Sequence, residues 1–242
     1  MIKFFRKIRQ NLLLENKTGK YLKYAIGEIL LVVIGILLAL QINNWNERRK
    51  LKINDLQLCK ELLNDAIADS IFYESRHVGL NELKATVNYI LEKPELRKPD
   101  STITELVNEG DQFMTIIGFR YLSNVVSNRK NSIQELQSKS VINALRRYFL
   151  RYDYVAAAFQ RLNTLNETEL NPLKKKHMNH FINLKETHDL NILNTIYDDE
   201  MVQKSMFIID GYIDDVISHL LVFQEDNREL IIVLKKRIDN SK

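Results

Sequence analysis

The sequence is poor in the residues that interrupt helices and in those that cross-link chains. Its 242 residues include only seven glycines, three prolines and one cysteine, Cys59. So few helix breakers favour long helices over many short strands. A single cysteine excludes an intramolecular disulfide, so the cysteine content does not indicate the redox compartment. The length allows one domain of about 200 residues with a terminal extension.

Acidic residues are scarce at the start of the chain. The first 52 residues contain eleven Lys and Arg but only three acids, whereas the remainder contains 24 basic and 28 acidic residues. The net charge of +4 therefore comes from the N-terminal segment, and the larger remainder is mildly acidic. An acidic domain argues against nucleic-acid binding, so we expect no nucleic-acid partner.

Charged residues are also absent from residues 29–40, an unbroken run of twelve apolar residues. This run alone is short for a membrane span, but Tyr24 to Trp45 covers about 31 Å of helix, which matches a hydrocarbon core of roughly 30 Å. Tyr21 and Tyr24 at one end and Trp45 at the other are placed as interfacial anchors. The sequence therefore predicts a transmembrane helix over residues 21–45 that contacts membrane lipid.

Basic residues flank this span on both sides, seven before it and four close behind it. The positive-inside rule then places the N-terminus in the cytoplasm and residues 46–242 outside it, in the periplasm of a Gram-negative cell. We therefore expect a single-pass protein of the inner (cytoplasmic) membrane. No A-x-A cleavage site follows the apolar run, which favours an uncleaved anchor over a signal peptide.

Residues 1–20 form a basic leader with apolar residues at helical spacing. Ile2, Phe5, Ile8 and Leu12 recur every three or four residues between lysines and arginines. Such an amphipathic helix can lie in the headgroup plane. The same basic residues can equally act only as the topology signal, and the sequence leaves both interpretations open.

Three small residues in the span form a candidate transmembrane helix contact. Gly35 and Ala39 make a small-xxx-small pair, and Gly27 lies two turns earlier. This pattern permits close helix–helix approach, although it also occurs by chance in apolar helices. Glu28 is the one ionisable residue in the span. It is either a functional carboxylate or an acid that reaches the nearby interface.

Beyond the span, the apolar pattern predicts an all-α fold. The first helix should continue to about residue 76, or to 92 with a break near Gly79, and end before Pro94. Residues 94–131 are the least regular segment. The apolar stripe of this helix is predicted to comprise Leu56, Cys59, Leu62, Leu63, Ala66, Ile67 and Ile71. We expect Cys59 to be packed and inert.

Later helices have recognisable starts and faces. Capping boxes at Thr102-x-x-Glu105 and Ser132-x-x-Glu135 predict helix N-termini, and Asn171-Pro172 predicts a helix reaching about residue 185. The second box should open a long helix with one apolar face: Val141, Leu145, Tyr148, Tyr152, Val155, Phe159 and Leu162. The C-terminal helix has a similar face: Ile213, Val216, Leu220, Asn227, Leu230, Leu234 and Ile238. Together these helices predict a transmembrane helix that continues into an elongated antiparallel bundle.

Residues 21–47, YLKYAIGEILLVVIGILLALQINNWNE, carry a resemblance to a known family. The stretch resembles the opening of an uncharacterised, domain-of-unknown-function family of single-pass, N-terminally anchored membrane proteins common in Bacteroidota. Phe4-Phe5-Arg6-Lys7-Ile8-Arg9 also fits the usual start. Similarity is weaker beyond residue 50. The resemblance implies the topology and a helical exterior domain, and it implies no activity.

Three patterns with chemical potential are better explained as structure. Glu74-x-x-His77 is half of a di-iron motif, but the chain has no second copy. His177-x-x-His180, with His188 nearby, lies beside three lysines that repel cations. Residues 146–154 are basic and aromatic, as expected of an amphipathic helix with solvated arginines. We therefore predict no catalytic residue, no metal site, no cofactor and no enzymatic activity.

Two classes of function remain. The first is a membrane-anchored interaction or structural module that binds a protein partner or a second copy of itself. The second is an extracytoplasmic sensory domain that binds a small ligand between helices and acts through a separate output protein. Only about 20 residues precede the span, too few for an output domain of its own, which favours the interaction module.

Overall fold

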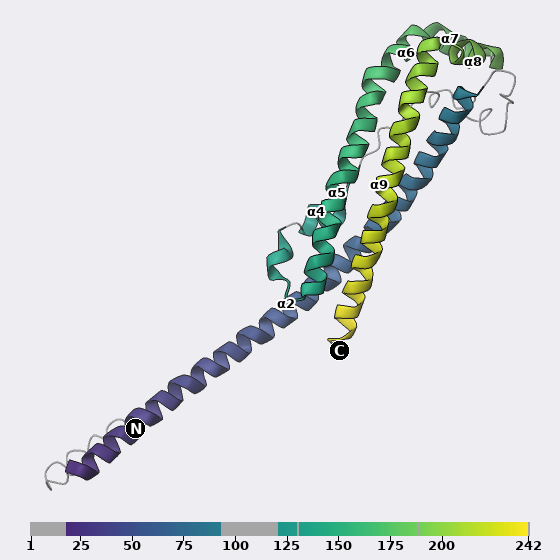
Figure 1. Ribbon diagram of the computed structural model, residues 1–242. Coiled ribbons are helices and arrows are strands. Elements are labelled where there is room, and N and C mark those ends of the chain that lie inside the picture. The colour runs from purple at the N-terminus through teal and green to yellow at the C-terminus, as the bar shows by residue number, and fades with distance from the viewer. Residues whose placement is uncertain (1–17, 93–120, 130, 188, 242) are drawn as a thin grey trace. The chain divides into compact units, whose positions relative to one another are not determined.

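The computed structural model describes residues 18–92, 121–129, 131–187 and 189–241, and every regular element in these ranges is helical (Figure 1). The all-α prediction is confirmed. Most of the predicted leader and the capping box at Thr102 lie outside the described residues. In chain order the elements are α2 (Thr18–Leu91), α4 (Asn124–Arg129), the 3-10 helix η1 (Ser132–Glu135), α5 (Lys139–Leu165), the π-helical turn η2 (Asn166–Leu170), α6 (Asn171–Lys176), α7 (Met178–Thr187), α8 (Leu190–Tyr197) and α9 (Glu200–Asp239).

The chain divides into two compact units, Met1–Asn54 and Asp55–Lys242, with the boundary inside α2. In the first unit, the large apolar side chains of residues 29–40 are between 43 and 63% exposed. This is the one helix in the described part of the chain that is long and apolar enough to cross a membrane. The core helix of a soluble protein would be buried, so this segment is consistent with a membrane anchor or a signal sequence.

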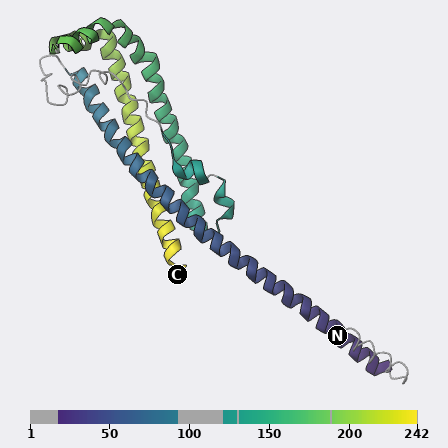
Figure 2. The same ribbon diagram turned by 180° about the vertical axis from the view of Figure 1, so that it is seen from behind.

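The second unit is built on three long helices: α2 from Asp55 onward, α5 and α9 (Figures 1 and 2). α9 runs antiparallel to α2. Asn227 Nδ2 donates to the Ala66 carbonyl oxygen at 3.0 Å, and, further along α2, Lys84 Nζ lies 2.7 Å from Asp214 of α9. α2 and α5 run in the same direction, because the chain returns to the start of the bundle before α5 begins.

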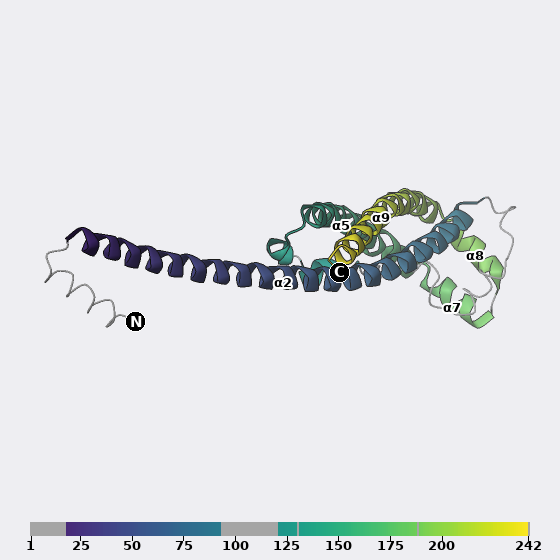
Figure 3. The ribbon, with the colours of Figure 1, turned by 90° about the horizontal axis from the view of Figure 1, so that it is seen from below.

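The short helices α6, α7 and α8 lie at the end of the bundle where α2 ends and α9 begins (Figures 1 and 3). Gln203, in the first turn of α9, ties this end together. Its side-chain amide donates to the carbonyl oxygens of Ile90 and Tyr197, each at 2.7 Å. A polar side chain thereby satisfies carbonyl groups that the ends of α2 and α8 leave without helical partners.

The predicted apolar faces of α5 and α9 are confirmed as the core. On α5, Tyr152 is half-buried and the other residues of the face are buried. On α9, Ile238 is half-buried and the rest are buried, including the polar Asn227. Residues three and four apart share one side of a helix, so each stripe faces the centre of the bundle.

The predicted stripe of α2 is partly wrong. Ile67 and Ile71 face outward, and Ile71 is 70% exposed, whereas Leu58 and Tyr73 are buried in their place. The helix also continues past Gly79 without a break. A glycine inside a helix costs about 1 kcal/mol. Burial of Leu80, Val87 and Ile90 on the following turns offsets this cost.

The predicted helix start at Ser132 is also wrong. Residues 132–135 form the 3-10 helix η1, and α5 begins only at Lys139, where Ser138 is the N-cap and its Oγ accepts from the Val141 N–H at 3.5 Å. Between them, Leu136 has extended backbone and a buried side chain. This anchor in the core separates the two helices.

Asn171 does not cap a helix as predicted. The π-helical turn η2 continues directly from α5, so the backbone is already helical when it reaches Asn171, the first residue of α6. Pro172 is accommodated because the early positions of a helix need no N–H donor. The helical region extends to Thr187, with a turn at His177 between α6 and α7.

Candidate functional site

Asp69 of α2 is the centre of a buried polar cluster. Its carboxylate is fully buried and accepts five hydrogen bonds. Two come from the backbone N–H groups of Asn124 (2.7 Å) and Val125 (3.1 Å), and one from the Asn124 side-chain amide (2.8 Å). The other two come from the hydroxyls of Ser123 (2.8 Å) and Tyr148 (2.6 Å).

These bonds explain how α4 forms. A helix of six residues is too short to be stable alone. Its first N–H groups are capped from another element by Asp69, and Ser123 Oγ accepts from the Val126 N–H at 3.0 Å. The cap therefore fixes residues 121–129 on α2, to which they are not adjacent in sequence.

Tyr148 links this cluster to the core. Because its proton goes to Asp69, the contact of 3.3 Å with the Tyr73 hydroxyl has Tyr73 as the donor. Burial raises the pKa of Tyr73 above its usual value, and the nearby Asp69 adds to the effect. Burial likewise raises the pKa of Tyr148. Both phenols therefore stay protonated and act as hydrogen-bond donors at neutral pH.

An aromatic cluster covers the same region. The ring of Tyr121 stacks on Tyr152, Phe159 and Tyr73, with centroids 4.9, 5.1 and 5.4 Å away. Phe223 of α9 meets Tyr73 edge-on at 4.6 Å. Such pairs add roughly 0.5–1.5 kcal/mol each beyond their burial. Because five donors occupy the lone pairs of Asp69, the arrangement is suited to holding the fold and leaves little acceptor capacity for a ligand.

A second buried carboxylate, Asp55, holds the other end of the same return segment. It accepts from the Gln137 N–H at 2.8 Å and from Arg237 Nε and Nη2 at 3.2 and 2.6 Å. Between the two aspartates, Arg129 at the end of α4 pairs with Glu61 and Asp65 (3.0 and 3.1 Å). Acids of α2 thus hold residues 121–138 at three places.

The sequence reasoning missed Asp55 and Asp69, although a signal for them exists. Both lie on the buried stripe of α2, at alternating spacings of four and three: Asp55, Cys59, Leu62, Ala66, Asp69 and Tyr73. An aspartate on an apolar stripe must find donors when it is buried. The pattern marks the residues as partnered, but it does not identify partners more than 50 positions away.

The histidine pair lies at the far end of the bundle. His177 Nε2 is 2.9 Å from Asp199 Oδ2, and the His177 and His180 rings are 5.5 Å apart. Lys176 binds the same carboxylate, and its hydrogen bond is the main reason that the pKa of Asp199 falls to about 2. In the part of the chain that the structure describes, no group of three or more His, Cys, Asp or Glu is placed to hold a metal ion. His188 lies outside the described residues.

The other chemical candidates make contacts within the bundle. Glu74 Oε2 accepts from Gln224 at 3.2 Å. Within the basic and aromatic stretch, Tyr148 faces inward while Arg147 and Arg151 pair with Asp226 and Glu229 on α9. These contacts connect neighbouring helices, as expected of a solvated helix face.

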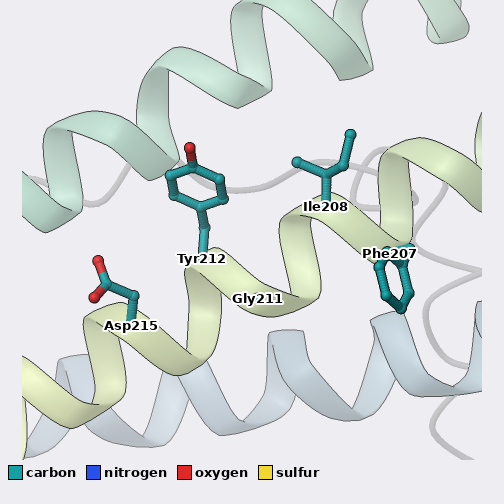
Figure 4. Close-up of a pocket in the computed structure, with 5 residues that line it drawn as sticks. All are labelled: Phe207, Ile208, Gly211, Tyr212 and Asp215. Carbon is teal, nitrogen blue, oxygen red and sulfur yellow. The ribbon is translucent and has the colours of Figure 1, made fainter.

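An open notch lies on the outer face of α9, with a volume of about 400 Å³ (Figure 4). Gly211 is at its centre, Tyr212 and Ile208 point to one side of the helix, and Phe207 points to the other. Phe207 is 74% exposed. No atom lies within 4 Å of the position that a side chain at Gly211 would take. Asp215 completes the lining, so the notch is apolar with one acid.

The predicted site residues of the span lie on an exposed helix. A side chain at Gly27 or Gly35 would meet no atom within 4 Å, and Ala39 is exposed. Trp45 is exposed as well, whereas the side chains of Tyr21 and Tyr24 lie outside the described part. The contact through the small residues stays a prediction.

The comparisons with known proteins concern the same region. The model of a family of unknown function, DUF6090, matches residues 28–210. The chain belongs to this family. The DUF6090 match begins inside the apolar helix and ends at Asp210 of α9, so it includes both buried aspartates of α2 and extends well past the resemblance at residues 21–47. Comparison with curated proteins and with solved structures gave no match.

Proposed function

We propose that this member of the DUF6090 family is a single-pass protein of the inner membrane, with its N-terminus in the cytoplasm and its helical bundle in the periplasm. The bundle acts as an interaction module that binds a protein partner or a second copy of the chain. The observation that carries the anchor is the exposure of apolar side chains over residues 29–40, because water disfavours such a surface and lipid accepts it.

The notch on α9 supports the interaction role. A helical glycine on an exposed face costs about 1 kcal/mol relative to alanine, and nothing within the described bundle packs against Gly211. Small residues allow another backbone to approach closely, and exposed aromatic residues such as Phe207 are typical of interface anchors. The proposal includes no catalytic step.

The sensory alternative has less support. Small-molecule sites are concave and enclose most of the ligand. The notch is open, and all five residues that line it belong to α9. Such a surface is better suited to another protein than to a small ligand enclosed between helices.

A fractionation experiment tests the anchor. The full chain should remain in the membrane pellet after alkaline extraction, and its N-terminal sequence should begin at or near Met1. Val33→Arg with Ile36→Arg should release the chain, because an arginine at the centre of a span costs about 2.5–3.5 kcal/mol. A mature chain that begins beyond Ala39 would mean that the segment is a signal sequence that is removed.

Photo-cross-linking in living cells tests the interaction module. A photoreactive phenylalanine at Phe207 should give one discrete cross-linked species, either a dimer of the chain or a complex with one other protein. The same group at Tyr154, an exposed aromatic on α5, is the control and should give none. Equal, diffuse labelling from both positions would contradict a binding surface on α9.

A further inference from the structure

The last turns of the first unit place three cations on one side of α2, beside the single tryptophan of the chain. Trp45, Arg48, Arg49 and Lys52 stand at positions i, i+3, i+4 and i+7, which share one face of a helix. All four side chains are exposed. The Arg49 guanidinium lies 5.7 Å from the centre of the Trp45 ring, a cation–π contact.

The remaining charges of this segment lie on the other side and neutralise one another. Lys50 Nζ is 3.2 Å from Glu47 Oε1. Arg48, Arg49 and Lys52, by contrast, have no acidic partner among the described residues. The helix therefore presents an uncompensated cationic face next to an indole ring, immediately after the apolar run.

We propose that this face, Trp45, Arg48, Arg49 and Lys52, binds the phosphate headgroups of anionic phospholipids in the bilayer that the span crosses. The inference rests on the proposed membrane anchor and holds in either orientation. Indole rings partition to the headgroup level, and guanidinium groups bind phosphate oxygens in pairs. Each cation near an anionic surface contributes roughly a fivefold preference.

The length of the apolar run supports this assignment. Twelve residues cover about 18 Å, less than a hydrocarbon core of roughly 30 Å. The span must therefore extend through Gln41, Asn43 and Asn44, which brings Trp45 and the cations to the lipid surface. Four basic residues behind the span also weaken the positive-inside signal. A headgroup-binding role accounts for their presence on that side.

Trp45 makes the test direct, because it is the only tryptophan in the chain. The full chain is reconstituted in phosphatidylcholine vesicles that contain either brominated phosphatidylglycerol or brominated phosphatidylcholine at equal mole fraction. Bromine quenches a nearby indole, so the ratio of the two quenching signals reports which lipid is enriched around Trp45. We expect several-fold stronger quenching by the anionic lipid, reduced when ionic strength rises from about 0.05 to about 0.5 M.

Two triple variants decide whether the face is responsible. Arg48→Gln, Arg49→Gln and Lys52→Gln together should bring the quenching ratio to about one. The control removes the same charge from paired cations elsewhere: Lys50→Gln, Lys204→Gln and Arg228→Gln. This control should keep the ratio of the unmodified chain. A ratio that survives the first triple variant, or that falls equally in both, would overturn the proposal.

Further arms separate the other sources of the signal. Inorganic phosphate that abolishes the preference, when chloride at the same ionic strength does not, would assign the face to free phosphate and overturn the lipid assignment. Equal quenching by both lipids in the unmodified chain would show an anchored protein without headgroup preference. No quenching by either lipid would instead overturn the membrane anchor itself.

Discussion

Tyr148 of α5 donates its hydroxyl proton to Asp69 of α2 over 2.6 Å, and both side chains are fully buried. This bond joins two helices of the bundle, and the same carboxylate caps α4. One aspartate therefore connects three elements that are distant in sequence. A buried acid in this position is costly unless all its donors are present, so the cluster forms only when the three elements are assembled.

Asp69→Asn should destabilise the bundle strongly. Asparagine has the same shape but places an NH2 group opposite donors, so at least one of Asn124 N–H, Val125 N–H or Tyr148 Oη loses its acceptor. We expect a loss of about 2–4 kcal/mol, or a fall in Tm of roughly 5–15 °C. Glu74→Gln, on an exposed position of the same helix, should change stability by less than about 0.5 kcal/mol. Similar melting temperatures for both variants would show that the cluster contributes little.

The helices that pack on periodic apolar faces could be predicted from the sequence. Val141 to Leu162 on α5 and Ile213 to Leu234 on α9 follow the 3.6-residue period, and burial follows that period directly. On α2 the period alone misled. Aspartates occupy two buried positions, and Ile67 and Ile71 are exposed in their stead.

The candidate sites were less predictable because their contacts are long-range. Nothing near Asp69 in sequence indicates that its donors are Asn124 and Val125, since the path of the return segment decides this. The notch at Gly211 was missed for a different reason. A glycine inside a helix gives the same sequence pattern whether its face is packed or exposed.

Acid should remove the contribution of Asp199. The hydrogen bond from Lys176, followed by those from the Met201 N–H and His177, lowers its pKa from 3.8 to about 2. A lowered pKa in the folded state stabilises the fold above pH 4, and this stabilisation is lost as the pH falls toward 2. Asp199→Asn keeps a good N-cap for α9, so it isolates the charge. The difference in Tm between the two chains should be largest above pH 5 and vanish near pH 2; a difference independent of pH would refute this account.

Cys59 should be unreactive in the folded protein. The thiol is fully buried, and burial, followed by repulsion from Asp55, raises its pKa to about 11. At pH 8 a thiol reagent should therefore react at least roughly 100-fold more slowly with it than with an exposed cysteine. Ser70→Cys, on an exposed turn of the same helix, provides the comparison. Denaturant should make both thiols react at similar rates, and fast labelling of native Cys59 would contradict its packing.

The small residues of the span make a further prediction. If Gly35 and Ala39 form a helix–helix contact, Gly35→Ile should separate the backbones and reduce the dimer population about tenfold. The readout is disulfide trapping by mild oxidant through Asn44→Cys, since the native thiol at Cys59 is buried. Leu38→Ile is the matched control and should leave trapping unchanged. If both substitutions give the yield of the parent chain, this face contacts lipid alone.

The central claim is that residues 21–45 cross the membrane and leave the bundle on its outer side. The most direct measurement fuses alkaline phosphatase, which folds only outside the cytoplasm, after Lys242 of the full chain, and compares it with a fusion to a fluorescent protein that matures only in the cytoplasm. The account predicts an active phosphatase and a dark fluorescent protein, both in the membrane fraction. An inactive phosphatase together with a bright fluorescent protein would place the bundle in the cytoplasm and contradict the claim.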